Sequence, residues 1–279
     1  MPLPSFVIVG AMRSGTTTLA SMMRRHPQVH LAAEKEVHFF DRHYDEGLDW
    51  YASRFDPTSE EIAVGEATPV YMYQDQARRR LATDLPDARL LAILRNPVDR
   101  AYSHYWHRVK AERESLPFEA ALEAEPQRLL TGGLDDLADF SYVDRGHYVD
   151  QLEALSQLAG RDRVKVVLLE DLTRDTENVM KDIFRFIGVD EVFAAEIPLR
   201  KTNDYRSARM KGLARWAENR PKPLRDVITR FNTIPAEYPP MVAATRARLE
   251  AEYAPYNERL SQWLGRELAA WAPKAKAGR

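Results

Sequence analysis

A short stretch near the N-terminus combines glycines, an arginine and several hydroxyls, which are residue types that suit the binding of an anion. Gly10 and Gly15 bound the stretch, and Arg13 lies between them. Its hydroxyl side chains, each able to donate a hydrogen bond, are Ser14, Thr16, Thr17 and Thr18. Because an apolar run precedes the stretch and a helical pattern follows it, backbone N–H groups and a helix N-terminus would converge there. The sequence therefore predicts a cradle for a phosphate or sulfate group.

The two glycines have the spacing of the P-loop, the phosphate-binding motif G-x-x-x-x-G-K-[ST]. Thr16 stands where the P-loop has its lysine, and the available cation is Arg13, three positions earlier. Because triphosphate chemistry depends on that lysine and on Mg²⁺, its loss disfavours a kinase or an ATPase. An arginine suits a planar, bidentate grip on sulfate or phosphate. The alternative is a helix-capping loop whose hydroxyls only face solvent.

Arg95 is a second candidate anion contact, directly after the apolar run at residues 90–94. Ligands of parallel α/β sheets collect at the carboxyl ends of the strands, where Arg95 would lie. Asn96 can cap the helix that follows, and Ser103 lies about two turns into that helix. We therefore expect Arg95 and Ser103 to hold a second phosphate, apart from the first. The alternative is a surface arginine and a serine without a special role.

Residues 35–51 mix ionisable and aromatic side chains densely. The ionisable ones that could do chemistry are Lys35, Glu36, His38 and Asp41. Glu36 could act as a general base, and a solvated loop carboxylate is the alternative. His38 is explained equally well as a packed or hydrogen-bonded histidine.

Two further histidines, His104 and His107, lie three residues apart on one predicted helix. Such a pair could suggest a metal site. The chain has no cysteine and no carboxylate motif near the pair, so we expect no metal. His104 is an alternative candidate for the general base.

The chain has 279 residues, with 40 Lys and Arg against 42 Asp and Glu and a formal net charge of −2. This balance disfavours a nucleic-acid-binding protein, although it allows a local basic pocket. The absence of cysteine excludes disulfides, zinc–thiolate sites and cysteine nucleophiles. No apolar run approaches the roughly 18 residues of a membrane span, and no targeting segment is visible. We therefore expect a cytoplasmic protein without a membrane span.

Apolar runs alternate with helical patterns, which predicts an α/β fold with a central parallel sheet flanked by helices. The runs that predict strands lie at residues 6–9, 62–64, 90–94 and 164–169. Helical patterns lie at residues 17–25, 75–85, 98–110, 149–158, 176–187 and 245–264. Segments 112–146 and 197–240 lack clear periodicity, so we expect long connections with short helices. With no repeat or linker, residues 1–279 are predicted to form a single domain.

Two of these motifs together resemble the nucleotide-binding motifs of sulfotransferases that use 3′-phosphoadenosine-5′-phosphosulfate (PAPS). The matching stretches are residues 10–19 and residues 94–103. The resemblance implies the P-loop-like sulfotransferase fold, with PAPS as the sulfuryl donor. It implies that the 5′-phosphosulfate is bound by Arg13, Ser14, Gly15, Thr16, Thr17 and Thr18. It also implies that Arg95 and Ser103 bind the 3′-phosphate.

Residues 35–41, Lys-Glu-Val-His-Phe-Phe-Asp, are similar to a run in heparan sulfate glucosaminyl 3-O-sulfotransferases and the related N-sulfotransferases. In those enzymes the glutamate after the lysine is the general base, which implies this role for Glu36. Lys35 would help to balance charge around the transferring group. His38 and Asp41 fall on positions that line the acceptor cleft in the family.

Residues 65–71 parallel another stretch of the family, which implies an acceptor contact for Glu66. The lysine that heparan-modifying enzymes carry next is Ala67 here, which counts against a heparan-like acceptor. Residues 197–215 occupy the place of the family's late nucleotide-binding loop. Nucleotide contacts are thereby implied for Arg209, Lys211 and Gly212, although an exposed basic helix explains this segment equally well.

The sequence thus predicts in-line transfer of a sulfuryl group from PAPS to a hydroxyl of a carbohydrate or other small molecule, without a metal. Glu36, Lys35 and Arg13 are the expected catalytic residues. The alternatives are a P-loop-type nucleotide kinase and a non-catalytic nucleotide-binding protein. An amine in place of the acceptor hydroxyl is also open.

Overall fold

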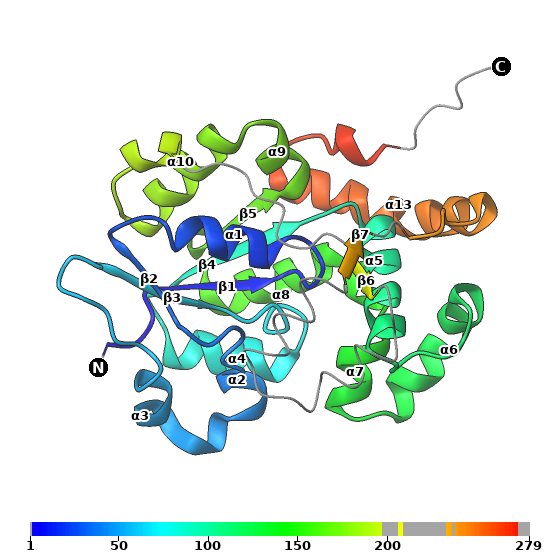
Figure 1. Cartoon of the computed structure of the whole chain (residues 1–279), viewed down its shortest axis with the longest axis horizontal. Coiled ribbons are helices and arrows are strands. Elements are labelled where there is room, and N and C mark those ends of the chain that lie inside the picture. Colours follow the sequence, from blue (N-terminus) through cyan, green and yellow to red (C-terminus); the bar gives the residue numbers. More distant parts are fainter. Residues whose placement is uncertain (1, 197–205, 209–232, 236–237, 273–279) are drawn as a thin grey trace. The chain divides into compact units, whose positions relative to one another are not determined.

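The computed structural model describes residues 2–196, 206–208, 233–235 and 238–272, and its centre is a five-stranded parallel sheet (Figure 1). The strand order is β2-β3-β1-β4-β5. The strands are β1 (Phe6–Gly10), β2 (Val29–Leu31), β3 (Ala63–Ala67), β4 (Arg89–Leu94) and β5 (Val164–Leu168). Because β1 lies between β3 and β4, the segments that follow these three strands begin at one edge of the sheet.

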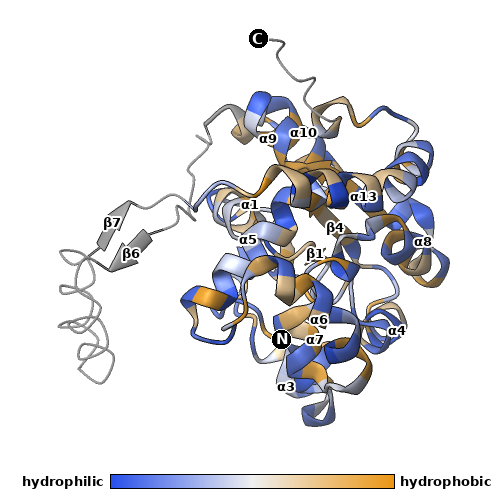
Figure 2. Cartoon of the chain, turned by 90° about the vertical axis from the view of Figure 1, so that its right-hand side faces the viewer, coloured by the Kyte–Doolittle hydropathy of each residue, from blue (hydrophilic) through white to orange (hydrophobic). Residues whose placement is uncertain are grey.

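Helices cover both faces of the sheet, as expected for parallel strands that are apolar along their length. One face packs against α1 (Thr16–Met23), α9 (Leu169–Arg174) and α10 (Thr176–Ile187). The other face packs against α4 (Asp75–Asp84), α8 (Tyr148–Ala159) and the closing helix α13 (Ala243–Leu264). Apolar residues accordingly gather on the ribbons around β1 and β4 (Figure 2). The predicted fold class is confirmed.

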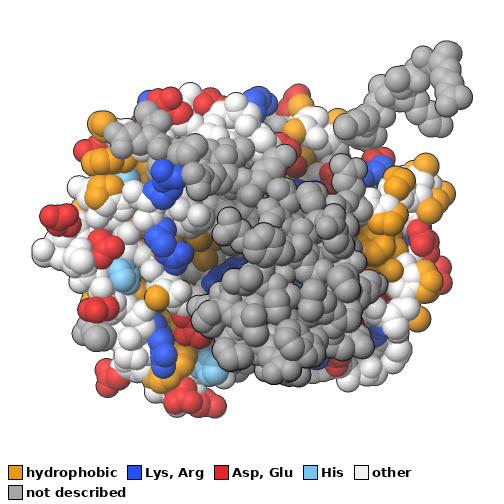
Figure 3. Space-filling view, in the orientation of Figure 1, with side chains coloured by type: hydrophobic (Ala, Val, Ile, Leu, Met, Phe, Trp, Pro, Cys, Tyr) orange, Lys and Arg blue, Asp and Glu red, His pale blue; other side chains and the backbone are white. Residues whose placement is uncertain are grey.

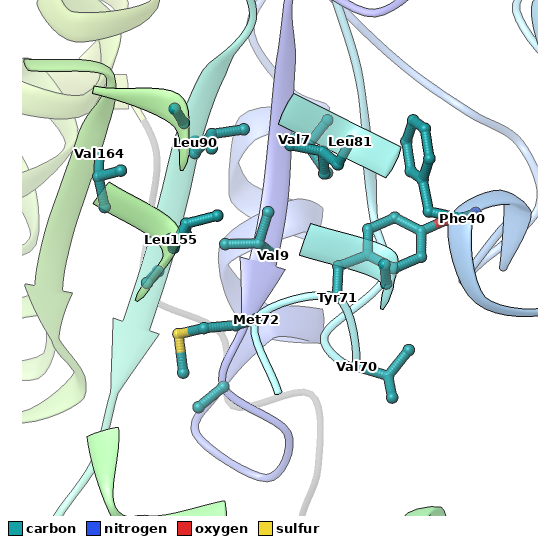
Figure 4. Close-up of a cluster of buried hydrophobic side chains, with 14 of the residues drawn as sticks. Val7, Val9, Phe40, Val70, Tyr71, Met72, Leu81, Leu90, Leu155 and Val164 are labelled. Atoms are coloured by element: carbon teal, nitrogen blue, oxygen red, sulfur yellow. The ribbon is translucent and has the colours of Figure 1, made fainter. Parts of the chain in front are cut away.

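Side chains of β1 alternate between the two apolar clusters. Phe6 and Ile8 belong to the cluster under α1 and α10, whereas Val7 and Val9 belong to the cluster under α4 and α8. Figure 4 shows the second cluster, in which Val7 lies beside Leu81 of α4. Complete burial of such a side chain contributes about 1.5–3 kcal/mol. The packing therefore fixes β1, and with it the starting point of the glycine-bounded loop.

The helix α5 (Pro97–Lys110) begins as the sequence predicts. The Asn96 side chain accepts hydrogen bonds from the backbone N–H groups of Val98 (3.0 Å) and Asp99 (3.3 Å). Pro97 occupies the first turn, where a missing N–H costs nothing. This cap sets α5 directly after β4, and α5 carries Ser103 back over the sheet edge.

The structure corrects the predicted elements at three places. The strand β2 was not predicted, because three residues are too few to give a distinct apolar run. The short helices α2 (Phe39–Arg42) and α3 (Gly47–Ala52) lie in a stretch treated as a loop. Segment 112–146, expected to hold only short helices, contains the 14-residue α6 (Phe118–Thr131) and α7 (Leu134–Phe140). The proline of α6, Pro126, is exposed, so it is tolerated although it suggested a break.

The chain divides into two compact units, residues 1–200 with 242–279 and residues 201–241. In the second unit, β6 (Arg206–Ala208) pairs antiparallel with β7 (Thr233–Pro235). The predicted nucleotide contacts Arg209, Lys211 and Gly212 lie outside the described residues. Across the described ranges, every helix is too short or too polar to cross a bilayer.

Gly65 of β3 provides a test of the core packing. A Cβ at this position would lie 2.4 Å from Cζ of Phe6 on β1. We expect Gly65→Ala to lower the free energy of unfolding by about 1–3 kcal/mol, because the ring and the strand must shift in a packed core. Urea denaturation of both proteins measures the difference.

Gly133→Ala is the matched control, since a Cβ there meets no atom within 4 Å. Its expected effect is within about 0.5 kcal/mol. Equal losses from the two substitutions would contradict the packing argument.

Candidate active site

The loop from β1 to α1, residues 10–18, has the geometry of an anion cradle, and we name it the anion loop. Gly15 occupies the N-cap of α1 with a φ of 100°, a left-handed conformation that favours glycine. A Cβ there would lie 2.9 Å from Cδ1 of Leu169, so glycine also permits close approach to the start of α9. The first turn of α1 carries no acidic side chain. An anion at this helix start would meet backbone N–H groups and the positive end of the helix dipole.

Arg13 connects the two anion contacts that the sequence predicts. Its guanidinium donates to the hydroxyl of Ser103 from Nε (3.3 Å) and from Nη2 (3.2 Å). Ser103 comes from α5 and is only 5% exposed. The sequence treated the two contacts as separate, whereas the structure joins one residue of each by hydrogen bonds. Of the remaining loop side chains, Thr17 is half-buried, and the buried ones are Ser14, Thr16 and Thr18.

Arg95 follows β4 directly and is half-buried at the same sheet edge as the anion loop. Two hydrogen bonds fix its backbone surroundings. The Tyr148 hydroxyl donates to the Arg95 carbonyl (3.0 Å), and the Asn96 N–H donates to Oε1 of Glu170 (3.0 Å). Since β1 and β4 pair up to Gly10 and Ala92, Arg95 lies near the anion loop.

Glu36, His38 and Asp41 form a line of contacts between β2 and α2. Nε2 of His38 lies 3.4 Å from Oε2 of Glu36, and its Nδ1 lies 2.9 Å from Oδ2 of Asp41. Lys35 approaches the other oxygen of Glu36, with Nζ 3.4 Å from Oε1. The sequence named these four residues but gave no sign that the imidazole bridges the two carboxylates. Their meeting depends on left-handed backbone at Glu36 (φ 62°) and His38 (φ 55°).

His107 of α5 relates this group to the anion loop. Burial lowers its pKa to about 4, together with the positive charges of Arg13 and Lys35 among others. Arg13 and Lys35 thus both lie close enough to His107 to lower its pKa.

The sequence matches the sulfotransferase domain family over residues 3–223. The chain belongs to this family. It is 30% identical over 190 residues to mouse heparan sulfate glucosamine 3-O-sulfotransferase 3A1, covering 68% of this chain and 47% of that protein. It therefore spans less than half the length of that relative, and the resemblance inferred from residues 35–41 is confirmed at the level of the family.

Solved structures agree with this membership. A sulfotransferase from Alicyclobacillus acidocaldarius is 30% identical, with a TM-score of 0.75 over 98% of this chain and 100% of that one. Mouse sulfotransferase SULT7A1, solved in complex with PAP, is 15% identical, with a TM-score of 0.53 over 96% of this chain and 87% of that one. At that identity the similarity shows the fold alone. The fold is the P-loop-like fold of sulfotransferases.

The contacts of His38 decide its charge. Burial lowers the pKa of His38, but hydrogen bonds and charge from Asp41 and Glu36 outweigh burial and raise the pKa to about 9. Burial raises the pKa of Glu36, and the contacts with His38 and Lys35 outweigh burial and lower that pKa. At neutral pH the group therefore consists of an imidazolium between two carboxylates, with Glu36 able to accept a proton.

Glu66, for which an acceptor contact was predicted, is buried. It is 1% exposed, and hydroxyls of Tyr51, Thr68 and Tyr71 donate to its carboxylate. Burial raises the pKa of Glu66, while these hydroxyls and the backbone N–H of Val37 lower it. This burial does not support the predicted contact between Glu66 and an acceptor. The sequence offered no sign of burial, because a glutamate near a strand end is usually exposed.

The surroundings of His104 do not support a role as an alternative base. It is fully buried, its Nε2 contacts the Ala138 carbonyl at 3.1 Å, and burial with nearby arginine charge holds its pKa well below 6.5. It is therefore a core histidine next to Ser103. Within the described residues no group of three or more histidines and carboxylates is placed to hold a metal ion.

The charge of His38 can be tested with Asp41→Asn. We expect the His38 pKa to fall from about 9 toward its usual 6.5, because the amide removes one charge and weakens the hydrogen bond. NMR titration of the imidazole protons measures the pKa, and His38→Gln assigns the signal.

The raised pKa of His38 also makes the stability of the fold depend on pH. Because the folded value lies above the unfolded one, protonated His38 stabilises the fold below pH 6.5, and that contribution is lost as the pH rises toward 9. Asp41→Asn should flatten this part of the stability profile. Titration of the wild-type histidine near 6.5 would contradict the arrangement.

Proposed function

We propose that the chain transfers a sulfuryl group from PAPS to an acceptor hydroxyl. The observation that carries this proposal is the joining of Arg13 to Ser103 beside a cradle that lacks the P-loop lysine. A single ligand with anionic groups at two places would use such a joined site. The family membership supports sulfuryl transfer, and SULT7A1 was solved with PAP, the product that PAPS leaves.

The donor would be held by the residues that surround the anion loop. The loop N–H groups, Arg13 and the hydroxyls of Ser14 and Thr16 to Thr18 would bind the 5′-phosphosulfate, and Arg95 with Ser103 would bind the 3′-phosphate. Positive charge in the interior favours this binding. Arg100 and Arg145 are buried, form no ion pair among the described residues, and add their charge to the surroundings of His104. An incoming dianion would meet a positive potential.

Glu36 would accept the proton of the acceptor hydroxyl as its oxygen attacks sulfur. One S–O bond forms to the acceptor while the S–O bond to the 5′-phosphate breaks, so the bonding pair leaves with PAP. Arg13 and the loop N–H groups would stabilise the negative charge that grows on the bridging oxygen. Because the pKa of Glu36 is lowered, proton transfer is favoured only once the oxygen has begun to bond to sulfur. Lys35 would offset charge around the transferring group.

The acceptor is proposed to be a carbohydrate or another small molecule with a hydroxyl. On the face shown in Figure 3, Lys and Arg side chains follow one another, with Asp, Glu and His side chains beside them. Such a surface suits a polar acceptor, and Ala67 counts against a heparan-like one. An amine acceptor is the alternative. Transfer of labelled sulfuryl to paired alcohols and amines of otherwise equal structure distinguishes the two.

A nucleotide kinase would prefer a different ligand. We expect adenosine 3′,5′-bisphosphate without Mg²⁺ to raise the melting temperature more than ATP with Mg²⁺, because the cradle lacks the lysine that a triphosphate requires. Differential scanning fluorimetry measures both. A larger shift with ATP and Mg²⁺ would favour the kinase.

Glu36→Gln tests the base. We expect kcat to fall about 10²–10⁴-fold with PAPS, since the amide cannot accept the proton. The dissociation constant for adenosine 3′,5′-bisphosphate should stay unchanged, because Glu36 is not a nucleotide contact. Glu34→Gln is the matched control: Glu34 is exposed and lies two residues earlier. Unchanged transfer by Glu36→Gln would instead favour a different base or a non-catalytic binding protein.

A further inference from the structure

The buried carboxylate of Glu66 lies beneath the segment that carries Glu36 and His38. Its Oε1 accepts hydrogen bonds from the hydroxyls of Tyr51 (2.6 Å) and Tyr71 (3.1 Å). Its Oε2 accepts from the hydroxyl of Thr68 (2.5 Å). A buried carboxylate is costly unless donors surround it, and here each oxygen has at least one. We therefore expect this buried carboxylate to have a role in the fold or in the site.

Two of these hydroxyls also contact the backbone above them. Oγ1 of Thr68 accepts from the N–H of His38, and Oη of Tyr71 accepts from the N–H of Phe40, each at 3.4 Å. Because both hydroxyl hydrogens point to Glu66, the oxygen lone pairs are left for the backbone N–H groups. Each bond is long for an N–H···O contact, so each is weak on its own. Tyr51 donates to Glu66 but has no such contact with the segment.

The segment that is held in this way is strained. Glu36 and His38 both have left-handed backbone, which costs a non-glycine residue free energy and persists only where the surroundings enforce it. Packing of the tyrosine rings supports the same segment. Phe40 lies against Tyr71 with ring centroids 5.3 Å apart (Figure 4), and Phe39 stacks on Tyr51 at 4.4 Å.

We propose that Glu66 is a positioning residue for Glu36. Through the hydroxyls of Thr68 and Tyr71 it fixes the N–H groups of His38 and Phe40, and so the place of the Glu36 carboxylate. The expected effect on catalysis rests on the proposed function. The expected effect on the backbone of residues 38 and 40 does not.

Tyr71 and Tyr51 form a matched pair for the test. Both rings are fully buried and both hydroxyls donate to the same oxygen of Glu66, but only the Tyr71 hydroxyl also accepts a hydrogen bond from the backbone of the segment. We expect Tyr71→Phe to lower kcat about tenfold or more, because small misplacement of a catalytic group is costly. Tyr51→Phe should lower kcat much less. Affinity for adenosine 3′,5′-bisphosphate should be equal in the two variants, and equal losses of kcat would overturn the proposal.

Hydrogen exchange gives a readout that does not need catalysis. Tyr71→Phe should speed exchange of the Phe40 N–H, and Thr68→Val that of the His38 N–H, each by about tenfold or more if an opening is made easier by one hydrogen bond. Tyr51→Phe should not change either rate, and Thr68→Ser should restore the wild-type rate. NMR at matched temperature below the melting point of each variant measures the rates.

The outcomes separate this proposal from the proposed function. If the wild type transfers no sulfuryl group from PAPS, the function fails, and the exchange rates still decide the positioning. If transfer occurs but Tyr71→Phe and Tyr51→Phe exchange alike at residues 38 and 40, the positioning role is overturned and the function stands.

Discussion

The hydrogen bonds from the Arg13 guanidinium to the Ser103 hydroxyl join the segments that follow two neighbouring strands. They are possible because β1 and β4 run parallel and end at one edge of the sheet. The rest of the site depends on this constraint. The anion loop and Arg95 both begin at that edge.

Charge in the site is arranged in two ways. Around Ser103, buried arginines lack ion pairs among the described residues, and the neighbouring His104 is kept neutral. Cations in that region suit an anionic ligand. Around Glu36, by contrast, cations and carboxylates alternate at 2.9–3.4 Å, so their charges largely cancel. The first arrangement favours binding, and the second keeps a carboxylate ionised next to it.

Much of the fold could be predicted from local patterns. Residues 90–94 and 176–187 were predicted with their type and nearly their bounds, because an apolar run and a 3.6-residue period are encoded within a few neighbours. The cap at Asn96 was predicted for the same reason. The strand β2 was not predicted, and the helix α6 was expected to be shorter. A three-residue strand has no period of its own, and Pro126 suggested a break in α6 although the helix continues through it.

The candidate site divides in the same way. The sequence by itself determined which residue types could bind an anion or take a proton, because glycine spacing, a missing lysine and the run from Lys35 to Asp41 are properties of the chain order. Only the tertiary structure decided which of them meet and which are buried. Arg13 and Ser103 are 90 residues apart and touch, whereas Glu66 and His104 are buried. Contact and burial depend on how distant segments pack, and no local pattern records that.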